Sequence, residues 1–131
     1  MKRLGAFRLA HAGAVTFEEI VDERLPVWTA LSDLFLDTEL LDADIHRIAE
    51  VLAKSPYGVA EIADILKDEV LPAFAPNLLS LAGEWTPWSE AEVRGIMERS
   101  FRARGGASPT ELMFGQSIFP EEWGRIAALL H

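Results

Sequence analysis

The chain has 131 residues, a net charge of -9 and no cysteine, and half of its residues are hydrophobic. A single domain of this length can bury a core without covalent staples, and the missing cysteines exclude disulfides and thiolate metal sites. The acidity argues against binding to nucleic acid or to anionic membrane surfaces, and it favours a basic protein partner or simply solubility.

The N-terminus is a short basic leader, residues 1–15, which we expect to be loosely ordered, whereas residues 16–131 should form a single helical domain. Arg8 and His11 interrupt the apolar run that a signal peptide needs. No stretch is long enough to cross a membrane. We therefore expect a cytoplasmic protein.

The first helices are predicted on either side of a proline. Thr16 with Glu19 makes a capping-box pattern that starts a short helix. Pro26 should interrupt it, and a new helix should begin there, because proline is tolerated mainly in the first turn. This second helix should end near Leu36. Its buried face follows from helical spacing and comprises Trp28, Leu31, Leu34 and Phe35.

The middle of the chain predicts further helices over about 42–54 and 59–70. Asp42 or Asp44 should cap the former. Pro72 should end or kink the latter, and Pro76 should divide the apolar segment that follows, leaving a short helix from about Asn77. The apolar stripes are formed by Ile45, Ile48, Val51 and Leu52, and then by Ile62, Ile65, Leu66 and Val70.

Towards the C-terminus, Ser89 and Glu92 make a second capping box, and the helix that follows should stop at Gly105-Gly106. A brief helical turn could open at Ser108, and residues 114–119 could form a strand that has nothing to pair with. Pro120 starts a final amphipathic helix. The predicted fold is all-α, an irregular bundle of about five or six short helices.

One pattern in the middle of the chain carries a resemblance. It comprises Val27-Trp28, Ala30 to Ser32, Leu34 to Leu40, Ser55 to Tyr57, Glu69-Val70 with Pro72, Asn77-Leu78 and Gly83 to Trp85. Over about residues 26–97 the chain resembles a family of small uncharacterised bacterial proteins. The resemblance implies a common fold, and it implies no activity.

No catalytic or metal-binding motif is present. Counted from Asp37, the sixth position of a calcium loop is Asp42 rather than the glycine that such a loop needs. His11, His46 and His131 lack the spacing of zinc ligands. The chain has neither a nucleophile elbow nor a glycine-rich phosphate loop. We therefore expect no cofactor, no metal ion and no enzymatic activity.

The acidic residues are concentrated, because residues 25–46 contain no lysine or arginine. Such a one-signed segment could be a solvated edge with helix caps, or it could steer a basic partner. In size and charge the chain is similar to immunity proteins, which neutralise cationic toxins, often nucleases. On this hypothesis basic groups of the toxin would be bound by Asp33, Asp37, Glu39, Asp42 and Asp44.

An aromatic side chain, Tyr57 or Trp88, would anchor the contact, although such residues also commonly roof a core. Two alternatives remain open. The first is a carboxylate-dependent or divalent-metal-dependent enzyme that uses Asp37, Glu39 and Glu84. The second is a structural or adaptor subunit whose acidic face keeps it soluble.

Overall fold

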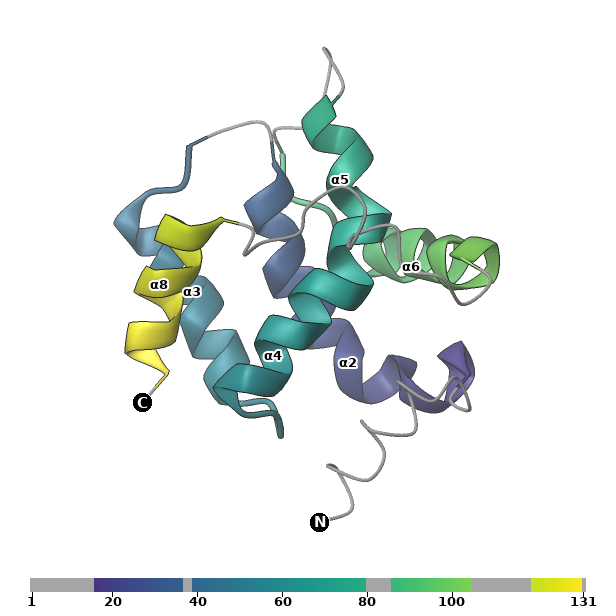
Figure 1. Ribbon diagram of the computed structural model, residues 1–131, viewed down its shortest axis with the longest axis horizontal. Helices are drawn as coiled ribbons and strands as arrows, with labels where there is room; N and C mark the ends of the chain where they lie inside the picture. Colours follow the sequence, from purple (N-terminus) through teal and green to yellow (C-terminus); the bar gives the residue numbers. More distant parts are fainter. Residues whose placement is uncertain (1–15, 37–38, 80–85, 105–118, 131) are drawn as a thin grey trace.

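The computed structural model describes residues 16–36, 39–79, 86–104 and 119–130 (Figure 1). The regular elements in these ranges are helical, which confirms the all-α prediction. Several sequence predictions lie outside the described residues, among them the leader over 1–15, the helix stop at Gly105-Gly106, the helical turn near Ser108 and nearly all of the strand considered at 114–119.

Helix α2 (Phe17–Ser32) is the longest element described, and it begins at Thr16 as predicted. The backbone N–H of Thr16 donates a hydrogen bond to the Glu19 carboxylate at 2.8 Å. The prediction that Pro26 separates two helices is wrong, since α2 runs through it. The proline removes the helical donor for the Asp22 carbonyl, but both side chains are exposed, so water can reach that side of the helix. Burial of the opposite face outweighs the local penalty.

Replacing Pro26 by alanine should therefore stabilise the protein. The variant regains a helical hydrogen bond, and we expect the free energy of unfolding to rise by about 1–2 kcal/mol after the gain in unfolded-chain entropy is subtracted. Urea denaturation measures this change. Pro120→Ala is the matched control, because Pro120 occupies the first turn of its helix, where a missing N–H has little cost. Equal effects of the two substitutions would contradict the explanation.

A short 3-10 turn, η1 (Asp33–Phe35), ends α2, and α3 (Asp42–Ala53) follows. The N-cap of α3 is Leu41, rather than either predicted aspartate. Asp44 nevertheless serves the helix start, because its Oδ2 accepts the backbone N–H of Leu41 at 2.9 Å. Of the stripe predicted for α3, Ile45, Ile48 and Leu52 are buried and Val51 is partly buried.

Helices α4 (Val59–Ile65) and α5 (Leu71–Leu79) are joined by a π-helical segment, η2 (Leu66–Val70). The helical path continues past both prolines, so Pro72 does not end a helix, and the prediction that Pro76 divides the segment is wrong. In η2 the N–H of Leu71 donates to the carbonyl of Leu66, five residues earlier. This wider turn lies immediately before Pro72, where a regular α-turn would bring the proline ring against a carbonyl group.

Helix α6 (Glu90–Arg104) begins with the predicted capping box, and α8 (Pro120–Leu129) is the last helix described. Ser89 N–H donates to Glu92 at 2.8 Å, and Glu92 N–H donates to Ser89 Oγ at 3.1 Å. Figure 1 shows α2 between α3 on one side and α6 on the other, with α8 lying along α3. The helices bury one hydrophobic core, in which Trp28, Leu31 and Phe35 are fully enclosed.

Candidate functional site

The structure separates the acidic residues that the sequence grouped together. Asp33 is buried, and its Oδ2 accepts a hydrogen bond from Arg47 Nη2 at 3.2 Å. Asp44 also bonds Arg47, through Oδ1 at 2.8 Å, while its other oxygen serves the start of α3. Asp37 lies outside the described residues. Asp33 and Asp44 thus both bind Arg47 within the fold.

The environments of the two aspartates shift their pKa values in opposite directions. The backbone N–H of Leu41 and the guanidinium of Arg47 lower the pKa of Asp44. Burial raises the pKa of Asp33, and Arg47 only partly offsets this effect. The charge of Asp33 is therefore less well compensated than that of Asp44, although both contact the same arginine.

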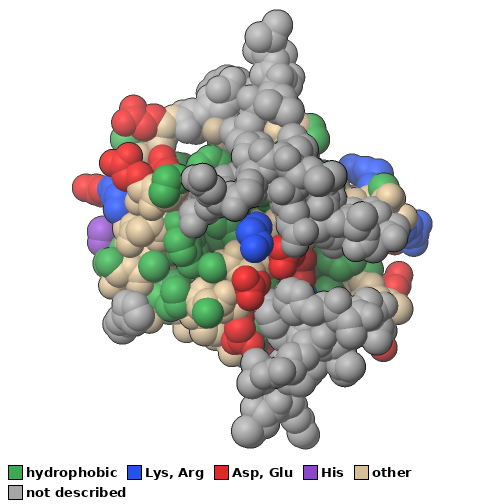
Figure 2. Space-filling model, in the orientation of Figure 1, with side chains coloured by type: hydrophobic (Ala, Val, Ile, Leu, Met, Phe, Trp, Pro, Cys, Tyr) green, Lys and Arg blue, Asp and Glu red, His purple; other side chains and the backbone are tan. Residues whose placement is uncertain are grey.

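The remaining predicted acids lie at one end of the bundle. Glu39 is exposed, and the Asp42 side chain is 81% exposed and forms an ion pair with Arg125 of α8. Because Arg125 lies beside the first residue of α3, the first turn of α8, with Glu121 and Glu122, lies at the same end. We call Glu39, Asp42, Glu121 and Glu122 the acidic end. Figure 2 shows acidic side chains gathering at the upper left, over the starts of α3 and α8.

The acidic end has a structural explanation as well as a functional one. Helices α3 and α8 run in the same direction along each other, because Leu129 borders a hollow with Ala43, His46 and Ala53 of α3 while Arg125 pairs with Asp42. Their N-termini therefore lie at the same end of the bundle. Carboxylates there stabilise the positive ends of two helix dipoles, each by about 0.3–1 kcal/mol.

The two predicted aromatic anchors differ in accessibility. Tyr57 is only 8% exposed, and its hydroxyl accepts from Arg24 Nε at 3.3 Å and donates to Glu23 at 2.8 Å. It offers too little surface to anchor a partner. Trp88 is half-buried and packs edge-to-face on Phe74, with ring centroids 4.8 Å apart. Trp88 also borders a cavity.

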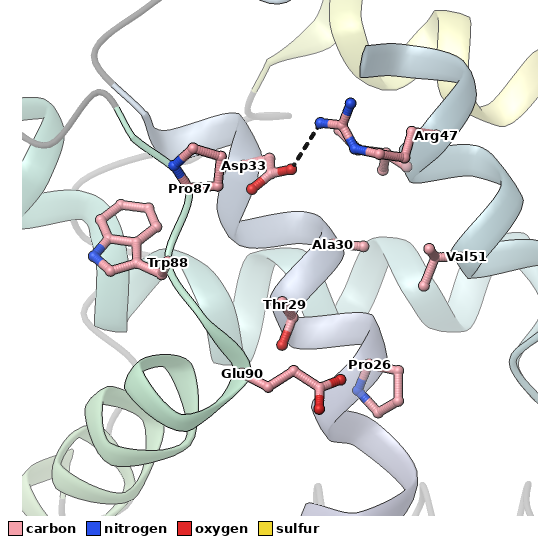
Figure 3. A pocket seen from close by; sticks show the side chains of 10 residues that line it. Pro26, Thr29, Ala30, Asp33, Arg47, Val51, Pro87, Trp88 and Glu90 are labelled. Atoms are coloured by element: carbon pink, nitrogen blue, oxygen red, sulfur yellow. Dashed lines mark hydrogen bonds and ion pairs between the residues drawn. The ribbon is translucent and has the colours of Figure 1, made fainter. Parts of the chain in front are cut away.

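That cavity lies between α2, α3 and the segment entering α6, and it has a volume of about 220 Å³. Figure 3 shows Asp33 between Pro87 and Arg47, with Trp88 and Glu90 on the side of α6. Its walls combine apolar atoms with the Asp33–Arg47 ion pair and the Glu90 carboxylate. The cavity therefore brings together two of the predicted site residues, Asp33 and Trp88.

Sequence reasoning missed a buried polar cluster in the core. Arg24 of α2 is 2% exposed and forms an ion pair with Glu69 of η2. The other oxygen of Glu69 accepts the indole N–H of Trp28 at 2.9 Å. The Arg24 guanidinium also lies 5.6 Å from the centre of the Tyr57 ring. The cluster ties α2 to η2 and to the turn that carries Tyr57.

The sequence held a signal for this cluster. Arg24 is four residues after Ile20 and four before Trp28, so it occupies the apolar face of α2. Treating Pro26 as a helix boundary hid that spacing. Burial would lower the pKa of Arg24, but Glu69 and the hydrogen bond to Tyr57 raise it, and the net shift is upward. The guanidinium stays charged and holds the fold together, and nothing in this group resembles an activated nucleophile.

Tyr57 provides a direct test of this environment because it is the chain's single tyrosine. Burial raises the pKa of Tyr57 from 10.0 to about 12, and Glu23 adds to the shift while Arg24 opposes it. Since the folded pKa is the higher one, Tyr57 stabilises the fold fully below pH 10.0, and this contribution is lost as pH rises towards about 12. We expect tyrosinate absorbance to titrate near the higher value in buffer and near the lower one in urea. A midpoint at the ordinary value in the folded protein would contradict the burial described.

The enzyme alternative gains no assembled site from the described residues. Asp37 and Glu84 lie outside them, and Glu39 is exposed. Within the described ranges, no three histidine, aspartate or glutamate side chains come together in a way that could hold a metal ion. No helix in the same ranges has the length and apolarity required to span a membrane.

The fold and these surfaces define a small all-α domain with an acidic end and one half-buried tryptophan beside a cavity. A family model described as a domain of unknown function, DUF7079, matches residues 22–128, and the chain belongs to this family. Neither a curated protein nor a solved structure matches the chain. Membership of an uncharacterised family is consistent with the resemblance that the sequence showed over residues 26–97, and the matched range extends into α8.

Proposed function

We propose that this protein is a non-catalytic binding domain whose acidic end holds a basic protein partner. More narrowly, we propose that it is an immunity-type inhibitor acting in the cytoplasm. It would mask the active site of a cationic toxin, a nuclease being the chemistry that fits best. Such an enzyme needs basic groups to hold a phosphate backbone, and the same groups would bind carboxylates.

The observation that supports this proposal most is the arrangement of the acidic end. Glu39 and Asp42 come from the start of α3, and Glu121 and Glu122 come from a helix some eighty residues later in the chain. The fold therefore adds two acids from a distant helix to Glu39 and Asp42, while Asp33 and Asp44 pair with Arg47. Like charges in one exposed region repel each other, and they also raise the association rate with a basic partner.

A purely structural role of the acidic end and a role in binding predict different effects of removing its carboxylates. If the carboxylates only stabilise helix starts, their removal should lower stability and leave partner binding unchanged. If they also form the interface, their removal should slow association with the partner in addition to any loss of stability. In an adaptor whose acids serve only solubility, their removal should leave partner binding unchanged.

The test compares two fourfold amide variants. The first is Glu39→Gln, Asp42→Asn, Glu121→Gln and Glu122→Gln at the acidic end. The matched control is Glu18→Gln, Asp22→Asn, Glu50→Gln and Glu98→Gln, which changes the same residue types at other positions and includes one acid paired with arginine. Both lose the same net charge.

The partner is first captured at low and high salt from the source organism, with the product of the adjacent gene included. We expect a stoichiometric basic protein whose binding weakens as salt rises. Stopped-flow association should then slow by about tenfold or more for the acidic-end variant and clearly less for the control. Equal slowing of both variants, or the absence of a basic partner at low salt, would refute the proposal.

A further inference from the structure

Asp33 is a largely buried carboxylate, and its second oxygen has no protein donor among the described residues but remains open to solvent. It is 8% exposed, and Arg47 Nη2 donates to its Oδ2 at 3.2 Å, which is long for a hydrogen bond between charged groups. Within the described ranges no donor reaches its Oδ1. Glu69, the comparable buried acid, receives the Arg24 guanidinium on one oxygen and the Trp28 indole N–H on the other. Asp33 therefore retains capacity for a second cationic donor.

The cavity beside Asp33 carries a net negative charge. Its charged wall residues are Asp33, Glu90 and Arg47, and Arg47 divides its donors between Asp33 and Asp44. The Thr29 hydroxyl in the same wall already donates to the Leu25 carbonyl at 2.8 Å. An entering group would thus meet two carboxylates and one arginine that is already engaged, whereas the Trp88 indole is directed away from Asp33 and Arg47 (Figure 3).

The size of the cavity favours one side chain over a whole ligand. Its volume is about 220 Å³, below the range of about 300–1,000 Å³ that is common for small-molecule sites. A lysine or arginine has an apolar stem that suits the apolar part of the cavity wall, and a cationic head that suits a carboxylate. The cavity also adjoins α3, whose first residue, Asp42, belongs to the acidic end.

We propose that this cavity is a subsite for one lysine or arginine side chain of the basic partner, with the cationic head on Asp33. The inference rests on the proposed function for the source of that side chain. It adds a specific anchoring position to a surface that otherwise acts through long-range charge, and Trp88, which borders the cavity while its indole packs on Phe74, is a nearby reporter of occupancy.

The test needs no partner. The probes are N-acetyl-arginine amide and N-acetyl-citrulline amide, which have nearly the same shape and differ in charge. The readout is the indole N–H resonance of Trp88 in NMR spectra, assigned by its loss in Trp88→Phe. We expect the arginine compound to shift this resonance saturably and the citrulline compound to leave it in place.

Asp33→Asn is the test variant, because asparagine keeps the shape and can still accept from Arg47. It should weaken binding of the arginine compound by about tenfold or more. Glu98→Gln is the control: it removes one acid that is also paired with an arginine, Arg102, and should leave binding unchanged. A missing response, equal responses to both compounds, or full binding by Asp33→Asn would overturn the subsite. A captured partner that is insensitive to Asp33→Asn would do the same while leaving the proposed function standing.

Discussion

Replacing Arg24 by methionine is expected to lower the free energy of unfolding by about 3–5 kcal/mol, because the buried Glu69 carboxylate loses its guanidinium partner. Arg24 and Glu69 are both buried, so little water is available to replace the lost interaction. Urea denaturation followed by circular dichroism measures the effect.

The double variant Arg24→Met, Glu69→Gln is the informative control. It removes the buried negative charge together with the positive one, and glutamine can still accept the indole N–H of Trp28. We expect it to be more stable than Arg24→Met alone, since much of the single-variant loss comes from an uncompensated charge. A single variant as stable as the natural protein would show that the pair contributes nothing.

Phe35→Ala should be about equally damaging, with an expected loss of about 3–5 kcal/mol in thermal or urea denaturation. Phe35 is fully buried, and its ring lies 6.1 Å from that of Phe74 and 5.0 Å from that of Phe119. Phe74 in turn packs on Trp88. Phe35 thus links the residue that starts α8 to the residue that borders the cavity.

The consequence should extend to both proposed binding features. Phe119 is the N-cap of α8 and has a φ of 53°, a left-handed conformation that a bulky residue adopts only when its surroundings hold it. Without the Phe35 ring, the start of α8 and the Trp88 indole both lose support. Phe35→Leu, which keeps most of the volume, should cost clearly less, about 1–2 kcal/mol. Similar losses for both substitutions would argue that ring packing at this position is unimportant.

The sequence by itself determined the fold class and most of the core. Trp28, Leu31 and Phe35 recur at helical spacing and are buried, and Ser89 with Glu92 caps α6 as their spacing predicts. These features follow from interactions within a few residues, so the pattern of neighbouring residues is sufficient to predict them. The all-helical character could likewise be predicted from the local sequence pattern.

Only the tertiary structure decided whether the helices continue through their prolines. Pro26 predicts a helix boundary and Pro72 predicts a helix end or a kink, yet the helical path continues through both. At Pro26 burial of the apolar face outweighs one missing hydrogen bond, and at Pro72 a π-turn accommodates the proline. Local propensity carries no information about that competition, which depends on what the rest of the chain packs against those faces.

Tertiary structure also decided which acidic side chains are buried, paired or exposed. Among five neighbouring candidates, Asp33 is buried at a cavity beside Arg47, Asp44 serves a helix start, and Asp42 faces solvent beside Arg125. Arg125 is 83 residues from Asp42, and Arg24 is 45 residues from the Glu69 that it neutralises. The sequence gives the net charge of a segment. Burial and ion pairing between distant segments decide which carboxylates stay accessible to a binding partner.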